Sequence, residues 1–166
     1  MEIIHDRRIG ESYWRHVPDG TLADAISDRP SDAIIVALAD WRGQKAALRR
    51  RPGPLGVRLG AGDDLDDILG DLESFGVVAI AFANATEGRG YTQARRLRER
   101  YGYSGEIRAV GDVSRDRLAF MERCGFNAFE LPGDARLQDA LDAFGEISDV
   151  YKPGADAQPT IASRRA

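Results

Sequence analysis

Apolar residues are concentrated in five short runs, separated by longer stretches in which apolar and polar positions mix. The first run, AIIVAL at 33–38, is continuously apolar, as expected for a strand buried on both faces of a parallel sheet. Similar runs, typical of β-strands, follow at 55–61, 77–83, 106–110 and 128–131. A shorter stretch, EIIHD, predicts a further strand near the N-terminus.

The stretches between these runs predict amphipathic helices. The clearest begins after Asp63 and Asp64 and ends at Gly76, with apolar residues at helical spacing at 65, 68, 69, 72 and 75. Other helices are expected at 91–101, at 114–125 with Ser114 as the N-cap, and at 137–144. Strands that alternate with helices are typical of a parallel sheet with right-handed crossovers.

These elements predict a single α/β domain with about five mainly parallel strands. Five strands are too few for a complete eight-stranded barrel, so a flavodoxin-like open sheet and a half (β/α) barrel are the two expected architectures. We expect an N-terminal strand–turn–helix extension at 1–32, whose helix begins after the cap Thr21. An α/β core domain at 33–148 and a flexible C-terminal tail at 149–166 complete the expected organisation.

Composition and charge narrow the class of protein. A length of 166 residues suits one domain, and a net charge of −4 argues against nucleic-acid binding, which needs a basic surface. No apolar run approaches the roughly 18 residues that span a membrane, and the N-terminus lacks a signal-peptide pattern. The single Cys124 excludes an internal disulfide and fits a reducing cytoplasm. With only two histidines besides, no zinc or iron–sulfur ligand set can be assembled, so no metal is expected.

Candidate site residues follow two of the expected strands. In parallel α/β folds, ligands bind where strands end and helices begin. Gly88, Arg89 and Gly90 follow the run at 77–83, and Asp112 and Arg115 follow the run at 106–110. If these strands are neighbours, the two arginines and the backbone N–H groups of 88–90 would hold a small anion at one rim. Asp112 is a weak candidate for a general base, provided that burial raises its pKa.

Structural roles are alternatives for each of these residues. The two glycines would then supply positive φ in a turn, Arg89 would pair with Glu87, and Asp112 would form a turn or a cap. The arginines at 95, 96, 98 and 100 are expected on a solvated helix face, and the acidic cluster at 63–67 at a helix N-terminus. Cys124 is expected to be a small core residue rather than a reactive thiol.

Known cofactor signatures do not match this chain. GRGYTQ begins like a dinucleotide-binding fingerprint, but Gln93 stands at the position of the third glycine. The chain has no glycine loop with a following Walker lysine and no G-x-S-x-G, C-x-x-C or H-E-x-x-H motif. No cofactor is therefore identified.

Three motifs carry a resemblance to a known family: GRGY at 88–91, GEIRAVGDV at 105–113 and RCGFNAF at 123–129. The chain resembles a bacterial domain-of-unknown-function family labelled as an oxidoreductase of sulfite reduction, most sharply over 88–131. The resemblance implies a place beside the assimilatory sulfite or nitrite reductase hemoprotein, which is the expected partner. It brings no catalytic residue set, and the residues themselves show no redox group, so whether the protein is an enzyme stays open.

Three functional hypotheses follow. The first is an accessory protein of assimilatory sulfite (sulfate) reduction that acts with sulfite reductase and has no cofactor motif of its own. The second is a protein or enzyme that binds sulfate, sulfite or phosphate at the rim around Arg89. The third is a structural module in which a homodimer covers the edge of a small parallel sheet.

Overall fold

Eight β-strands in one sheet form the centre of the molecule, in the computed structural model that describes residues 1–84, 86–133 and 135–146. The strands are β1 (Glu2–His5), β2 (Arg8–Glu11), β3 (Arg15–His16), β4 (Ile34–Ala37), β5 (Leu55–Leu59), β6 (Val77–Phe82), β7 (Glu106–Gly111) and β8 (Ala128–Phe129). The α-helices are α1 (Leu22–Asp28), α2 (Leu38–Arg49), α3 (Arg89–Arg95), α4 (Leu118–Arg123) and α5 (Leu137–Glu146). Shorter helical segments are η1 (Leu65–Asp67), η2 (Leu69–Ser74), η3 (Arg96–Arg100) and η4 (Arg115–Arg117); η3 is a π-helix that continues α3.

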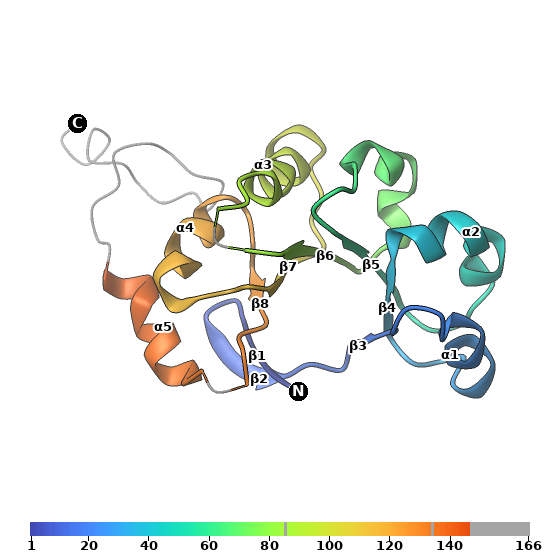
Figure 1. The fold of residues 1–166 in the computed structure, drawn as a ribbon, viewed down its shortest axis with the longest axis horizontal. Coiled ribbons are helices and arrows are strands. Elements are labelled where there is room, and N and C mark those ends of the chain that lie inside the picture. The colour runs from blue at the N-terminus through green and yellow to red at the C-terminus, as the bar shows by residue number, and fades with distance from the viewer. Residues whose placement is uncertain (85, 134, 147–166) are drawn as a thin grey trace.

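The sheet curls into a half-barrel. Its strand order is β2-β1-β8-β7-β6-β5-β4-β3, and β3 to β8 run parallel in chain order. The order of these parallel strands never reverses, as it would in a flavodoxin-like sheet, so the half-barrel is the correct one of the two expected architectures. Figure 1 shows the strands following an arc with the helices on its outer side.

The expected count of about five strands is wrong, and the strands are not all parallel. β1 pairs antiparallel with both β8 and β2. The apolar pattern misses β2 because most of its side chains are exposed, and it misses β3 because this strand has only two residues. Neither strand shows the alternation of apolar and polar residues by which a strand is recognised in a sequence.

A three-residue connection at 12–14 joins the two edges of the sheet. β2 ends at Glu11 and β3 begins at Arg15, so four peptide links hold these edge residues at most about 14 Å apart. In Figure 1 this connection spans the opening of the half-barrel. The N-terminal residues therefore cover the concave side of the sheet.

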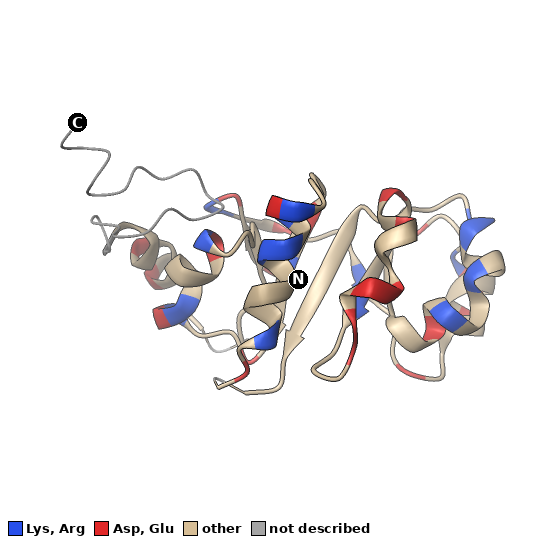
Figure 2. Ribbon diagram, turned by 90° about the horizontal axis from the view of Figure 1, so that it is seen from above, with Lys and Arg blue, Asp and Glu red and all other residues tan. Residues whose placement is uncertain are grey.

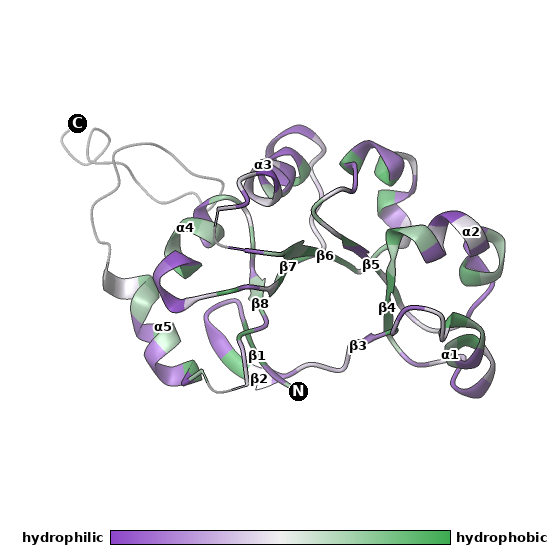
Figure 3. Cartoon of the chain, viewed as in Figure 1, coloured by the Kyte–Doolittle hydropathy of each residue, from purple (hydrophilic) through white to green (hydrophobic). Residues whose placement is uncertain are grey.

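Apolar side chains form two clusters, because successive residues of a strand point to opposite faces. The larger cluster packs between the sheet and the helices and includes Ile34, Val57, Ile80 and Phe129. The smaller cluster lies on the concave face and consists of Trp14, Ala33, Ile35, Val77, Ala79 and Val110, with Ala81 against it. Figure 3 shows the hydrophobic residues along the central strands, whereas Figure 2 shows most charged residues on helices and loops.

The segment after Asp63 and Asp64 differs from the expected α-helix. It forms two 3-10 segments, η1 and η2, separated at Ile68, and Asp64 caps the first by accepting from the backbone N–H of Asp66. From Leu69 to Phe75 the apolar residues recur every three residues, which matches the 3-10 repeat better than the α-helical one. The acidic residues thus lie at a helical N-terminus as expected, although the helix is of another type.

The other expected helices are confirmed, but their expected caps are not. α3 with η3, η4 with α4, and α5 cover the three remaining predicted segments. Thr21 and Ser114 precede helices, yet neither side chain makes a capping hydrogen bond, and the Thr21 hydroxyl donates to the Pro18 carbonyl instead. The sequence pattern does not single out α2, in which only three residues are buried.

The N-terminal residues contribute three strands to the same sheet as the rest of the chain. The proposed boundary at residue 32 stays a prediction, and the proposed tail at 149–166 lies outside the described residues. Among the residues that the structure describes, no helix is long and apolar enough to cross a membrane.

Candidate functional site

A buried arginine stands on the concave face of β7. Arg108 is only 1% exposed, and its neighbours along the strand face the helices. Its Nε donates to Glu106 Oε1 at 2.5 Å, and its Nη1 donates to Glu130 Oε1 at 2.7 Å. Nη1 also donates to Ser12 Oγ at 3.0 Å, which ties the 12–14 connection to β7. Two carboxylates thus offset the large cost of burying the guanidinium charge.

The network continues across the half-barrel to β3. Glu130 directly follows β8, and its two oxygens lie 2.9 and 3.1 Å from His16 Nε2. Four strands separate β8 from β3 in the sheet, so this contact crosses the concave side. We call Glu106, Arg108, Glu130, His16 and Ser12 the interior network.

Opposing effects act on the Glu130 carboxyl. Burial by itself raises its pKa, but hydrogen bonds and charge interactions with His16 and Arg108 outweigh burial, and the net result is a lowered pKa. Glu130 is therefore held as a carboxylate on the concave face of the sheet.

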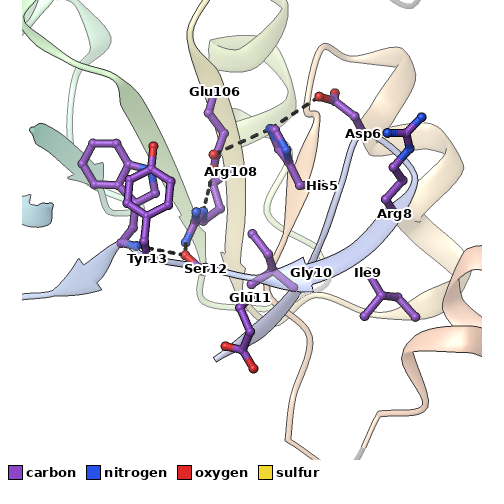
Figure 4. Close-up of a pocket in the computed structure, with 12 residues that line it drawn as sticks. His5, Asp6, Arg8, Ile9, Gly10, Glu11, Ser12, Tyr13, Glu106 and Arg108 are labelled. Atoms are coloured by element: carbon purple, nitrogen blue, oxygen red, sulfur yellow. Dashed lines mark hydrogen bonds and ion pairs between the residues drawn. The ribbon is translucent and has the colours of Figure 1, made fainter.

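A pocket of about 310 Å³ opens beside the interior network (Figure 4). Its walls are the β1–β2 hairpin, the 12–14 connection and the beginning of β7. His5 Nε2 lies 3.6 Å from Asp6 Oδ2 and 3.7 Å from Glu106 Oε2, so the imidazole stands near two carboxylates. The rings of Tyr13 and Trp14 stack with centroids 5.4 Å apart, and in Figure 4 Tyr13 lies on the other side of Arg108 from His5.

The hairpin turn beside His5 is strained and held by long-range contacts. Asp6 and Arg7 have φ of 47° and 58°, a left-handed conformation in which two-residue hairpin turns prefer Asn and Gly. The Asp6 N–H donates to the Asn127 carbonyl at 2.8 Å, and the Arg7 guanidinium donates to both oxygens of Glu122 at 2.8 and 2.7 Å. These contacts with the β8 side of the molecule fix the turn and with it one wall of the pocket.

The structure does not bring the predicted rim residues together. β6 and β7 are neighbours as expected. However, Arg89 Nη2 lies 3.8 Å from Asp64, which follows β5, whereas Arg115 Nε donates to the Asp139 carbonyl of α5 at 2.9 Å. The two arginines thus contact neighbours on different sides, and no contact shown brings them together around one anion. The anion site at this rim stays a prediction.

Asp112 is exposed, so the burial that a general base would need is missing. Its carboxylate lies 3.3 Å from Arg117 Nη2, and its backbone N–H donates to the Phe82 carbonyl at 2.8 Å. The alternative pairing of Arg89 with Glu87 is not seen either, because the Glu87 carboxylate accepts from the Ala83 N–H at 2.9 Å. These contacts hold the loops after β6 and β7.

The glycines of the GRGY motif do not have the structural role that the sequence predicts. Neither Gly88 nor Gly90 has a positive φ, so the expectation of a left-handed turn is wrong. A Cβ on Gly90 would lie 2.8 Å from the Phe82 ring and 3.0 Å from Ile80, whereas a Cβ on Gly88 would meet nothing within 4 Å. Gly90 therefore allows α3 to pack closely on β6.

Replacement of Gly90 by alanine is expected to lower the free energy of unfolding by about 1–3 kcal/mol, because the core side chains must shift. Gly88→Ala is the matched control and should stay within about 0.5 kcal/mol of the parent. Urea denaturation followed by tryptophan fluorescence measures both. Equal effects of the two substitutions would contradict close packing as the reason for Gly90.

The arginines of α3 and η3 do not all lie on a solvated face. Arg98 is partly buried and donates from Nε to the Gly125 carbonyl and from Nη1 to the carbonyls of Tyr103 and Gly105, at 2.9, 2.6 and 2.7 Å. Its Nη2 donates to Asn127 Oδ1 at 3.1 Å. The expectation is therefore wrong for Arg98, which joins the loop before β7 to the loop before β8, whereas the exposed Arg95 and Arg100 agree with it.

Cys124 is a buried core residue, as expected. Burial, the largest influence, raises the pKa of its thiol against the opposing effect of Arg95. A raised pKa disfavours the thiolate that a reactive cysteine needs.

The sequence interpretation missed the interior network. The signal was present at two places, since Glu106 and Arg108 alternate with apolar residues in EIRAV and Glu130 ends the apolar stretch AFE. Charged residues at alternate positions of a central strand indicate that one face of this strand makes polar contacts. Their partners Ser12 and His16 lie about a hundred positions earlier in the sequence. Local sequence patterns carry no information about contacts between residues so far apart along the chain.

Within the described ranges, no group of three His, Cys, Asp or Glu side chains is arranged to hold a metal ion. Comparison with protein families finds a match over residues 56–161 to the family described as a bacterial protein of unknown function, DUF934. No curated protein matches the chain.

Proposed function

Because the chain belongs to the DUF934 family of bacterial proteins, we propose that it is an accessory protein of assimilatory sulfite reduction that binds sulfite reductase. The observation that carries the proposal is the set of GRGY, GEIRAVGDV and RCGFNAF motifs, which all lie within the matched region. The family that these motifs resemble is labelled for sulfite reduction.

Three glycines of these motifs have roles in packing. Gly111 has a φ of +86°, and a Cβ there would lie 2.4 Å from the Phe82 carbonyl oxygen. Gly125 has a φ of +113°, and a Cβ there would lie 2.6 Å from Arg98 Cγ. Together with Gly90, these residues serve the packing of the half-barrel, which presents a stable surface to a partner.

Two exposed aromatic side chains offer points of contact for such a partner. Tyr13 is 74% exposed on the 12–14 connection, and Phe120 is 51% exposed on α4. Exposed aromatic residues are common anchors of protein interfaces.

Capture with purified components tests the proposal. The full chain is immobilised and exposed to the sulfite reductase hemoprotein, and saturable binding in the micromolar range or tighter is expected. Phe120→Ser and Tyr13→Ser are measured in parallel, and at least one of them should weaken binding if an exposed aromatic side chain anchors the partner.

Growth of a deletion strain provides the second measurement. We expect slow growth with sulfate as the sulfur source and normal growth with cysteine. Absence of binding together with normal growth on sulfate would refute the accessory function.

A further inference from the structure

The strand β2 is one edge of the sheet, and half of its backbone groups face away from β1. The Ser12 N–H donates to the Met1 carbonyl at 2.9 Å, which fixes the alternation of the β1–β2 ladder. Every second residue of β2 therefore bonds to β1, while the N–H and carbonyl groups of Ile9 and Glu11 point to the free edge. Among the described residues, no other strand pairs with β2 and no backbone hydrogen bond uses these four groups. Such an edge can accept a further strand.

Two pockets lie beside β2, one on each face of the sheet. The pocket of about 310 Å³ on the concave face includes all four residues of β2, and a Cβ on Gly10 would meet no atom within 4 Å. A second pocket, of about 430 Å³, lies on the face that packs against the helices. Its lining is largely apolar and includes Met1, Ile9, Leu131, Pro132, Ala135 and Leu137. A strand added to this edge would direct alternate side chains toward the two pockets.

Negative charge accumulates at one end of the edge. Glu2 and Glu11 are direct partners in the ladder, and like charges in such a pair repel each other. The amino group of Met1 pairs with Glu11 at 2.8 Å, whereas Glu2 makes no ion pair with any described residue. At the other end Arg8 lies beside Asp6 (Figure 4), so the charges there are balanced. A strand with a basic side chain opposite Glu11 would offset the excess of carboxylates.

We propose that the free edge of β2 binds an extended segment of a partner protein by strand addition, with an apolar residue opposite Ile9 and a basic residue opposite Glu11. Both residues of the partner would lie on the helix face, where the apolar side chain enters the second pocket and the basic one reaches the two carboxylates. The residue between them would lie over Gly10, where the space is open. This proposal goes beyond the proposed function and does not depend on it.

Calorimetric titration of the full chain with synthetic peptides tests the pairing. The parent peptide, acetyl-Thr-Thr-Lys-Thr-Val-Thr-Thr-amide, carries a basic and an apolar residue two positions apart for antiparallel pairing, in a sequence of high strand propensity. An N-methyl group on its valine removes the N–H that would donate to the Ile9 carbonyl, and should weaken binding about tenfold or more. An N-methyl group on the central threonine is the matched control, because that N–H points away from β2, and should change binding less than about twofold. Replacement of the lysine by glutamate should weaken binding about threefold or more.

Variants of the edge test the location. Ile9→Pro removes an N–H that points to the free edge, a position at which edge strands tolerate proline. It should weaken the parent peptide about tenfold or more, whereas Ile9→Val should change binding less than about twofold. Glu11→Lys should reverse the charge preference, so that the glutamate peptide binds more tightly than the lysine peptide. Circular dichroism confirms that each variant is folded, and the N-methylated peptides give the same test should Ile9→Pro fail to fold.

Amide hydrogen exchange reports the new hydrogen bonds directly. At saturation with the parent peptide, exchange of the Ile9 and Glu11 N–H groups should slow. Exchange of the Gly10 N–H, which already bonds to β1, should stay unchanged.

Any of four outcomes overturns the proposal: no binding of the parent peptide at millimolar concentration, equal binding of the two N-methylated peptides, an unchanged preference for lysine in Glu11→Lys, or full binding by Ile9→Pro. A dimer of the parent chain that Ile9→Pro dissociates in sedimentation would assign the edge to a second copy and would also overturn it. Binding of sulfite reductase is measured separately, so the failure of one proposal is distinguishable from the failure of the other.

Discussion

Replacement of Arg98 by alanine is expected to lower the free energy of unfolding by about 3–5 kcal/mol. The guanidinium donates to three backbone carbonyls and to the amide oxygen of Asn127. Burial, the largest influence on its pKa, lowers the pKa of this arginine, in keeping with a site shielded from water. Its removal leaves partly buried acceptors that water reaches poorly, and it breaks the link between the loops that precede β7 and β8.

Two further variants make this prediction specific. Arg100→Ala is the matched control on the same helical segment, because Arg100 is exposed and contacts the ring of Tyr101. Its effect should stay within about 0.5 kcal/mol. Arg98→Lys keeps the charge but loses the fork of donors, so an intermediate effect is expected. Chemical denaturation gives the three values, and a loss below about 1 kcal/mol for Arg98→Ala would contradict the bridging role.

Replacement of Arg108 by methionine is the second large effect, with an expected loss of about 3–5 kcal/mol. Methionine fills much of the same space but leaves the carboxylates of Glu106 and Glu130 without their main partner. Both carboxylates are largely buried, with side chains 14% and 13% exposed, so water only partly replaces the guanidinium.

A double-mutant cycle separates the charge effect from packing. Glu130→Gln should destabilise the parent, yet it should restore part of the stability of Arg108→Met, since it removes the unpaired charge. Additive effects of the two substitutions would show that the ion pair between Arg108 and Glu130 contributes nothing beyond packing.

The pH dependence of Glu130→Gln supplies an independent readout. Because the pKa of Glu130 is lower in the folded chain than in the unfolded one, its carboxylate stabilises the fold above the ordinary glutamate pKa of about 4.3. This contribution is lost as the pH falls through the lowered value. The difference in unfolding free energy between parent and variant should therefore be constant near neutral pH and shrink below about pH 4. A difference that grows on acidification would have the wrong sign.

Much of the parallel sheet was predictable from local patterns. The apolar runs at 33–38 and 77–83 mark β4 and β6 within one residue or two at their ends. Such strands are buried on both faces, so nearly every residue in them is apolar and the run is easily recognised. The strands β2 and β3 were not predictable, because their pairing depends on residues far along the chain and their side chains are mostly polar.

The rim around Arg89 illustrates why site prediction stopped short. Adjacent parallel strands do place the ends of β6 and β7, and the segments that follow them, at one edge, as the strand order requires. The direction of each long side chain is decided by the nearest partner, and Arg89 and Arg115 find theirs on different neighbours. The sequence therefore predicted where these two segments lie in the fold, but it did not predict which residues Arg89 and Arg115 contact.

The sequence by itself determined the α/β class, the central parallel strands, the burial of Cys124 and the membership of a bacterial family, because each depends on local composition or on contiguous motifs. Only the tertiary structure decided the half-barrel, the interior network and the pocket. These depend on curvature that brings Ser12 and His16 against Arg108 and Glu130 across roughly a hundred residues. A buried charge is stable only when folding brings partners of opposite charge or hydrogen-bonding groups against it. The role of such a residue is therefore evident from the tertiary structure and not from its local sequence.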